Sequence, residues 1–386
     1  MKYSLIVYLL SNLLFISCTG GKKQADAYED KNRTRIDTLV FSVSDVLNLK
    51  SYHLSSACRD GTTDYIYAYN DKAHALDKIN LTDKNIRQIP LATDGKDAIG
   101  RYVLSMLAYT PDSIWLYDNA NRLVLLNNKG EIRLSVDLGK ELKAGELIAT
   151  NQNYSMANSH FYYDNKRRSL LYGITDRTTS PKSFKVRETF LSGEKPCVDY
   201  PLQAPLFLSD ISNYGWMSEV NINFTDSAIV YNYPAESTIF VMDRTTGKTS
   251  NFESRSRYTN NVAEACTSKD YTRWESYQLE NPHFYDVVYL PKCNLYARLH
   301  LDKISGRITQ ASDVQFFNRQ LYLMLFSPDF SVVGEYALAP QRYDYCNGWC
   351  ATEDALCLYV NNILDETAQS SEGLTLDRIY PPRLCR

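Results

Sequence analysis

The sequence lacks an excess of charge of either sign. Its 42 Lys and Arg residues are nearly balanced by 45 Asp and Glu residues, which leaves a formal net charge of −3 at pH 7. A protein that binds nucleic acid or an anionic membrane surface through its global charge needs a basic field to attract the polyanion. This balance argues against both modes of binding, and we expect no nucleic-acid partner.

Local catalytic motifs are also missing. The five histidines are scattered, and no His-Glu-x-x-His pair is present to seat zinc above a glutamate base. No Gly-x-Ser-x-Gly nucleophile elbow occurs. The segment TTGKT at 245–249 ends like a phosphate-binding loop, but Met242 occupies the position where that motif requires glycine. We predict no catalytic residue, metal or cofactor, although a fold that gathers distant residues would leave catalysis open.

Cysteine spacing does not indicate a metal site either. Cys346, Cys350 and Cys357 form a cluster in the sequence, but they lack a Cys-x-x-Cys pair and a nearby histidine. Eight cysteines remain apart from Cys18, and an even number in an exported protein permits disulfides. The sequence does not choose among their pairings.

The N-terminal apolar segment is too short to span a membrane. It runs from Leu5 to Ile16 after Lys2, whereas a spanning helix needs roughly 20 residues. It ends in Phe15-Ile16-Ser17-Cys18, which resembles a bacterial lipobox with Phe15 in place of the more usual leucine. The resemblance implies a lipoprotein signal peptide at 1–17 and a lipid-anchored Cys18. A plain signal peptide with an accidental cysteine is the alternative.

The residue after Cys18 bears on location. It is Thr19 and not aspartate, which favours the outer membrane; the side that the protein faces stays open. Residues 18–36 are small and polar, as expected for a flexible tether, and we expect one folded domain over 37–386.

What the sequence does have is a repeated β pattern. The stretch 113–138 alternates three short strand-like pieces with two turn clusters rich in Asn and Asp, which is typical of an antiparallel meander. The chain contains 30 Tyr against 14 Phe, and tyrosine favours strands while keeping a polar tip. A tyrosine that closes an apolar strand recurs along the chain at Tyr69, Tyr117, Tyr172, Tyr231, Tyr289 and Tyr359.

Weak self-similarity at the spacing of these tyrosines predicts an all-β propeller with four-stranded blades. We favour six blades, with residues 319–339 as the outer strands of the fifth; seven blades result if this segment is a blade of its own. Pairing the isolated strand 37–43 with 374–380 in one blade would close the ring and hide two strand edges.

These features together are similar to a known family. An exported, lipobox-bearing, Tyr-rich chain with VVYLPKCNLYARL followed by LYLMLFSPDFSVVGEYAL resembles the uncharacterised six-bladed β-propeller lipoproteins of Bacteroidota, a DUF4221-like family. The resemblance implies the fold and an envelope location, and no activity.

Three insertions longer than a bare blade are the candidate binding sites. Their aromatic and basic residues suit stacking on sugar rings and pairing with carboxylates. The predicted ligand-binding residues are Tyr214, Trp216, Arg255, Arg257, Arg273, Trp274 and Trp349. The alternative is that the tryptophans are wedges packed between blades.

We therefore predict a monomeric, lipid-anchored propeller of the cell envelope that binds a glycan, peptide or protein on its loop face without catalysis. The rival is a polysaccharide hydrolase or lyase with carboxylates at the propeller channel. A structural subunit of an envelope complex is a third reading.

Overall fold

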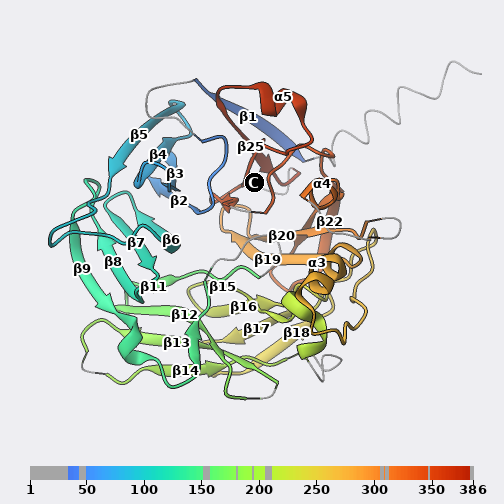
Figure 1. The fold of residues 1–386 in the computed structure, drawn as a ribbon, viewed down its shortest axis with the longest axis horizontal. Helices are drawn as coiled ribbons and strands as arrows, with labels where there is room; N and C mark the ends of the chain where they lie inside the picture. Colours follow the sequence, from blue (N-terminus) through green and yellow to red (C-terminus); the bar gives the residue numbers. More distant parts are fainter. Residues whose placement is uncertain are drawn as a thin grey trace, which may run out of the picture.

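The computed structural model describes residues 34–42, 49–150, 157–179, 181–193, 195–204, 211–304, 308, 313–346 and 348–382. Over these residues, six antiparallel sheets stand around a common axis as the blades of a propeller (Figure 1). The expected signal peptide, Cys18 and most of the tether lie outside the described residues. Within the described chain, no helix has the length and apolar character needed to cross a membrane.

In blades 1, 2, 4 and 5, the four strands follow one another along the chain from the axis outward. Blade 1 contains β2 (Ser55–Asp60), β3 (Thr63–Asn70), β4 (Ala75–Asn80) and β5 (Asn85–Pro90). Blade 2 contains β6 (Val103–Thr110), β7 (Ser113–Asp118), β8 (Arg122–Leu126) and β9 (Ile132–Asp137). Blade 4 contains β15 (Asn221–Phe224), β16 (Ala228–Asn232), β17 (Ile239–Asp243) and β18 (Thr249–Phe252). Blade 5 contains β19 (His283–Leu290), β20 (Leu295–Leu301), β21 (Leu321–Phe326) and β22 (Val332–Ala337).

Blade 3 departs from this pattern at the axis. Its outer strands are β12 (Ser169–Asp176), β13 (Ser183–Phe190) and β14 (Val198–Pro201). The innermost position is shared by two short strands, β10 (Glu146–Ile148) and β11 (Tyr162–Asp164), which pair with opposite ends of β12. The chain between them is therefore an insertion in the innermost strand.

Blade 6 closes the ring with both ends of the described chain. Its order from the axis is β23 (Cys350–Ala351), β24 (Leu356–Tyr359), β25 (Leu374–Tyr380) and β1 (Arg35–Phe41). β1 pairs antiparallel with β25 from Arg35 opposite Tyr380 to Phe41 opposite Leu374. The predicted closure is confirmed. Six blades are also confirmed, because β21 and β22 are the outer strands of blade 5.

The repeating tyrosine marks the second strand of a blade, with one exception. Tyr69, Tyr117, Tyr172, Tyr231 and Tyr359 lie on second strands and are each buried. Tyr289 lies on β19, the first strand of blade 5, so the tyrosine of this unit stands one strand earlier than in the other blades. The excess of tyrosine also serves the interior: the buried rings of Tyr67 and Tyr172 carry hydroxyl groups that bond to Pro111 O and Thr189 Oγ1.

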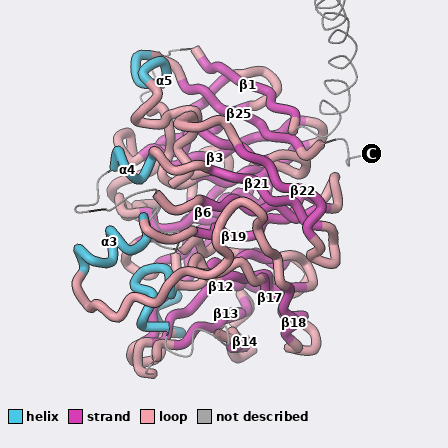
Figure 2. The backbone as a smooth tube through the Cα atoms, turned by 90° about the vertical axis from the view of Figure 1, so that its right-hand side faces the viewer, coloured by secondary structure: helices cyan, strands magenta, loops and turns pink. Residues whose placement is uncertain are grey.

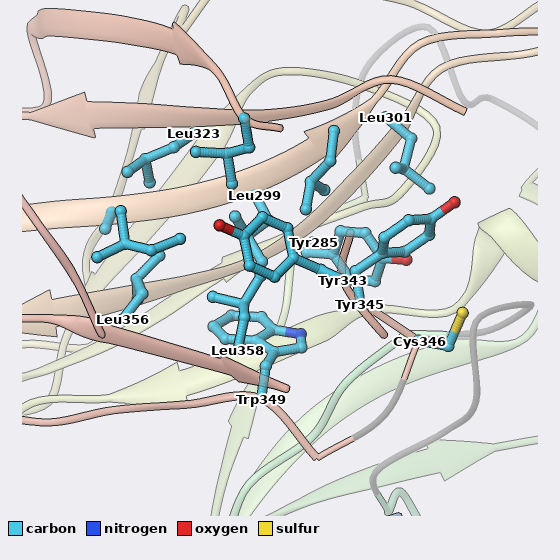
Figure 3. Packing of buried hydrophobic residues seen from close by; sticks show 14 of the residues in the cluster. Tyr285, Leu299, Leu301, Leu323, Tyr343, Tyr345, Cys346, Trp349, Leu356 and Leu358 are labelled. Carbon is cyan, nitrogen blue, oxygen red and sulfur yellow. The ribbon is translucent and has the colours of Figure 1, made fainter. Parts of the chain in front are cut away.

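The apolar core consists of six layers, one between each pair of neighbouring blades. This follows from strand alternation, since the faces of each blade are covered by the blades on either side. Figure 3 shows the layer between blades 5 and 6, where Leu299 and Leu323 face Leu356 and Leu358 beside Trp349. The smallest layer lies between blades 4 and 5.

The two ends of the propeller differ. Alternating strand direction places the turns between first and second strands, and between third and fourth strands, at one end, which we call the hairpin face. The described connections between second and third strands, and between one blade and the next, lie at the opposite end, the helix face. These connections contain η2 (Leu138–Glu141), η3 (Ile211–Ser218), α3 (Tyr271–Leu279), α4 (Asp313–Phe317) and α5 (Glu366–Ser370). Figure 2 shows α3, α4 and α5 together at this end.

Ring closure should contribute strongly to stability. Phe41 is 1% exposed and packs between blades 6 and 1, whereas its neighbour Val40 is 57% exposed. Phe41→Ala should lower the free energy of unfolding by about 3–5 kcal/mol because it leaves a cavity in the closing layer. Val40→Ala, on the same strand, should change it by less than about 0.5 kcal/mol. Denaturant unfolding would measure both, and equal effects would contradict this role of β1.

Candidate functional site

The propeller axis holds a pocket of about 660 Å³. All six blades contribute to its wall, through Ser55, Met106, Phe161, Asn223, Asp286 and Trp349 among others. The pocket extends to the hairpin face, since its lining includes Asp226 and Ser227 of the β15–β16 turn and Pro291 of the β19–β20 turn. Its volume falls within the range of about 300–1,000 Å³ that small-ligand sites occupy.

Asp286 of β19 is the centre of a polar cluster in this pocket. Its side chain is 1% exposed, and it lies at an irregularity in the β19–β20 register. Its Oδ1 accepts a hydrogen bond from Asn158 Nδ2 at 2.8 Å. Its Oδ2 accepts from His160 Nε2 at 2.9 Å and from Asn223 Nδ2 at 3.3 Å. Residues from blades 3, 4 and 5 therefore meet at one buried carboxylate.

His160 links this cluster to the open pocket. Its side chain is 31% exposed. An ionised carboxylate only accepts hydrogen bonds, so Nε2 of the imidazole carries the proton that is donated to Asp286. In the neutral ring, Nδ1 is then the acceptor nitrogen.

The insertion of blade 3 places His160 at the axis. Its residues 158–160 run parallel to β15, with Ile222 N donating to Asn158 O at 2.9 Å and His160 N donating to Ile222 O at 3.4 Å. Gly173 of β12 leaves room for this segment. A Cβ at Gly173 would lie 2.9 Å from Ser159 Oγ and 2.8 Å from Ile222 Cδ1.

Aromatic side chains form much of the remaining wall. The rings of Tyr162 and Phe224 stack with centroids 5.7 Å apart, and those of Tyr289 and Tyr296 lie 4.9 Å apart. Tyr162 donates its hydroxyl to Asp226 Oδ1 at 2.6 Å. Burial, followed by this hydrogen bond, raises the pKa of Tyr162, so the phenol stays neutral.

The acidic side chains that line the pocket have no permanently charged basic counterpart among the described lining residues. Asp226 and Asp286 contribute carboxylates, while none of the described residues that line the pocket is Lys or Arg. The arrangement is thus suited to neutral or positively charged ligands and repels anionic ones.

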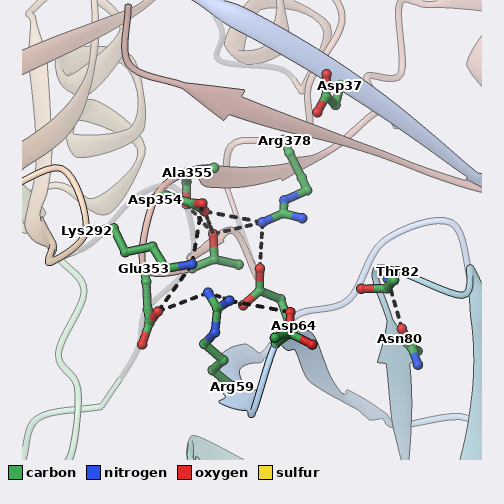
Figure 4. A network of polar contacts seen from close by, with 12 residues as sticks. Asp37, Arg59, Asp64, Asn80, Thr82, Lys292, Glu353, Asp354, Ala355 and Arg378 are labelled. Carbon is green, nitrogen blue, oxygen red and sulfur yellow. Dashed lines mark hydrogen bonds and ion pairs between the residues drawn. The ribbon is translucent and has the colours of Figure 1, made fainter. Parts of the chain in front are cut away.

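A second, smaller pocket of about 250 Å³ adjoins the first toward the hairpin face and shares four lining residues with it, Ala57, Tyr289, Pro291 and Ala351. The positively charged side chain that lines this second pocket, Arg59, is already paired with carboxylates. Arg59 Nη1 lies 3.0 Å from Glu353 Oε2 and 3.5 Å from Asp64 Oδ1. Arg378 Nη2 lies 2.7 Å from Asp64 Oδ2, which completes a network between blades 1 and 6 (Figure 4).

Four of the predicted site residues gather on the helix face, away from the channel opening. Tyr214 and Trp216 come from η3, and Arg273 and Trp274 come from α3. The Trp216 ring lies edge-on to Trp274 at 6.1 Å, and Trp274 Nε1 donates to Ser268 O at 2.7 Å. Arg273 Nη2 pairs with Glu280 Oε2 at 2.6 Å. The contact between Trp216 and Trp274 joins η3 to α3.

The other three predicted residues lie in separate places. Arg257 Nη2 donates to Glu335 O at 2.9 Å, and Arg255 pairs with Glu253 at 3.2 Å. Trp349 is 9% exposed, packs in the layer between blades 5 and 6, and lines the channel pocket. The seven residues therefore do not form one site, and Trp349 is the member that reaches the channel.

The family of the chain follows from its sequence match to a family model. The model described as "Domain of unknown function (DUF4221)" matches residues 32–337. This chain belongs to the DUF4221 family. The match includes β1 and blades 1 to 5, whereas β23, β24 and β25 lie beyond its end.

Solved structures support the same fold. A DUF4221 family member from Bacteroides vulgatus superposes with a TM-score of 0.71 at 14% identity, covering 91% of this chain and 98% of that chain. A Bacteroides fragilis protein that is provisionally described as exported gives a TM-score of 0.47 at 13% identity, over 90% of this chain and 95% of that chain. At 14% identity the first likeness supports the fold and nothing more, and we draw no conclusion from the second. No curated protein matches the chain.

The sequence of this DUF4221 chain does not reveal the polar cluster around Asp286, because its members lie far apart along the chain. Asn158 and Asp286 are separated by 128 positions. A usable signal was the long stretch between β9 and β12, which exceeds what one inner strand needs and contains His160.

Cysteines and metal ligands add no further site. Cys350 and Cys357 are thiols opposite one another on β23 and β24, and Cys293 is disulfide-bonded. Cys385 lies outside the described residues. Across the part of the chain that the structure describes, no group of three or more His, Cys, Asp or Glu side chains is arranged to hold a metal ion.

A separate pocket of about 440 Å³ on the helix face contains an unusual acid. Glu236 and Arg255 line it together with Glu253. Glu236 is 1% exposed, and its Oε1 has no hydrogen-bond partner. Burial raises the pKa of Glu236 to about 8, against smaller opposing effects from a Thr238 hydrogen bond and the charge of Arg298.

This acid should make stability depend on pH. Its pKa of about 8 in the fold exceeds the ordinary 4.5, so the folded state holds the proton over that interval and the unfolded state releases it. The free energy of unfolding should therefore fall as pH rises from 4.5 to 8. Glu236→Gln should flatten this decline. Glu253→Gln, a change at a side chain that is 75% exposed in the same pocket, should leave it intact. Denaturant unfolding at several pH values would decide, and an unchanged slope in Glu236→Gln would refute the assignment.

Proposed function

We propose that this DUF4221 chain is a lipid-anchored propeller of the cell envelope that binds a saccharide in its channel pocket without catalysis. The observation that carries the proposal is the pocket at the axis, to which all six blades contribute and in which blades 3 to 6 supply aromatic rings beside hydrogen-bonding groups. Aromatic faces pack against the apolar faces of sugar rings, and neighbouring polar groups orient the hydroxyls. His160, Asn223 and Asp226 supply those polar groups.

The channel supports binding better than turnover. Asp286 is held by three N–H donors, and Asp226 is held by a phenol. Glycoside hydrolysis needs one carboxyl as acid and a second as base or nucleophile on opposite sides of the bond. A lyase acting on uronic acids would need a cation for the substrate carboxylate, and the described lining has no Lys or Arg. We therefore favour binding.

Binding at the channel can be separated from binding at the helix face. Purified full chain would be screened against immobilised oligosaccharides, and affinity measured by calorimetry. Tyr289→Ala removes one aromatic wall of the pocket and should weaken binding roughly 3- to 10-fold. The matched control is Tyr271→Ala, an aromatic of α3 that is 61% exposed on the helix face. Loss of binding in Tyr271→Ala alone would move the site to the helix face.

Lipid anchoring is supported by the short apolar segment that ends at Ser17-Cys18. Cys18→Ala should abolish labelling with radioactive palmitate and shift the protein out of the membrane fraction, because the acyl-accepting thiol is gone. Ser17→Ala keeps a small residue before the cysteine and should remain lipidated. Membrane retention and labelling in Cys18→Ala would contradict the proposal.

A further inference from the structure

We propose that the saccharide bound in the channel carries a positively charged amine, and that Asp226 selects for it. This inference rests on the proposed binding of a saccharide in the channel pocket. It adds the charge of the ligand and the residue that recognises it.

Asp226 offers a carboxylate whose charge is not neutralised by its partner. It is exposed in the turn between β15 and β16, and it lines the pocket. The hydroxyl of Tyr162 donates to its Oδ1 at 2.6 Å. Since this phenol is neutral, the hydrogen bond orients the carboxylate without cancelling its charge.

One guanidinium lies behind this pair, and its charge is already offset. The Arg244 guanidinium is 5.5 Å from the centre of the Tyr162 ring, and Nη1 donates to the backbone oxygen of Asp226 at 2.9 Å. Its Nη2 lies 2.8 Å from Asp164 Oδ2 and 3.6 Å from Glu188 Oε1. Glu188 also pairs with Arg167, whose Nη1 lies 3.0 Å from Glu188 Oε2, so two carboxylates offset these two cations. The Asp226 carboxylate therefore remains available to a ligand.

The other groups that line the pocket also favour a positively charged ligand. The buried carboxylate of Asp286 receives neutral amide donors from Asn158 and Asn223, and it is opposed by a cation only when His160 is protonated. The face of Tyr289 attracts cations through the ring quadrupole, whereas the Tyr162 ring already packs against Phe224 and Arg244. A carboxylate beside aromatic faces, with no Lys or Arg in the described lining, matches an ammonium group and repels a uronate.

The test uses disaccharides that share one β-1,4-linked glucose backbone and differ in charge. The amine form is the glucosamine disaccharide, the neutral forms are its N-acetylated counterpart and cellobiose, and the anionic form is the corresponding uronic acid disaccharide. Affinities of the full chain are measured by calorimetry at a pH where the amine is protonated. The amine form should bind at least about tenfold more tightly than either neutral form, and this ratio should shrink with added salt.

Asp226→Asn removes the charge and keeps the size, so it should reduce the preference to within about threefold while neutral sugars still bind. Asp112→Asn is the matched control. Asp112 occupies the equivalent turn of blade 2, pairs with Arg133 at 2.7 Å and does not line the pocket, so its change should preserve the preference.

The outcomes separate the two proposals. Binding of the neutral forms with no amine preference, or an amine preference that survives Asp226→Asn, overturns the charge assignment and leaves saccharide binding standing. Failure of every disaccharide to bind overturns saccharide binding in the channel and the charge assignment with it.

Discussion

Ring closure by β1 and β25 is the constraint on which the structure depends. Strands from the two ends of the described chain pair over seven residues each, and the buried carboxylate of Asp377 fastens them. It accepts hydrogen bonds from Thr38 of β1 at 2.7 Å, from Arg342 at 2.7 Å and from Tyr343 at 2.9 Å. Because each blade covers the faces of its neighbours, an open ring would expose apolar surface on both sides of the gap.

Closure also creates the candidate site. Six inner strands that face one axis cannot all fill it with side chains, and a pocket remains to which every blade contributes. The insertion of blade 3 then decides its chemistry. By running beside β15, it brings Asn158 and His160 to a buried aspartate of blade 5. The channel wall thus combines aromatic rings with polar groups, among them the buried carboxylate of Asp286.

The junction between blades 4 and 5 differs from the other interfaces. Its apolar layer is the smallest, and the guanidinium of Arg298 is buried there between Phe284 and Phe326, 4.8 and 5.2 Å from their ring centres. Nη1 donates to Ser237 O and Nη2 to Ser254 O, and burial lowers the pKa of Arg298 to about 9. Polar contacts thus replace part of the apolar packing at this junction, next to the buried acid Glu236.

Strand alternation, turn residues and the recurring tyrosine are local signals, and they predicted a propeller and favoured six blades. The pairing of its ends was predicted because a propeller ring has to close. Local signals also located the insertions around Trp216 and Trp274, and the structure places both residues on the helix face. The channel site could not be predicted in this way, because only the folded ring brings its residues together. Asn158, Asn223 and Asp286 belong to three blades and become neighbours only when the ring closes. No spacing in the sequence carries that information, since it depends on the angle between blades and on how one strand is interrupted.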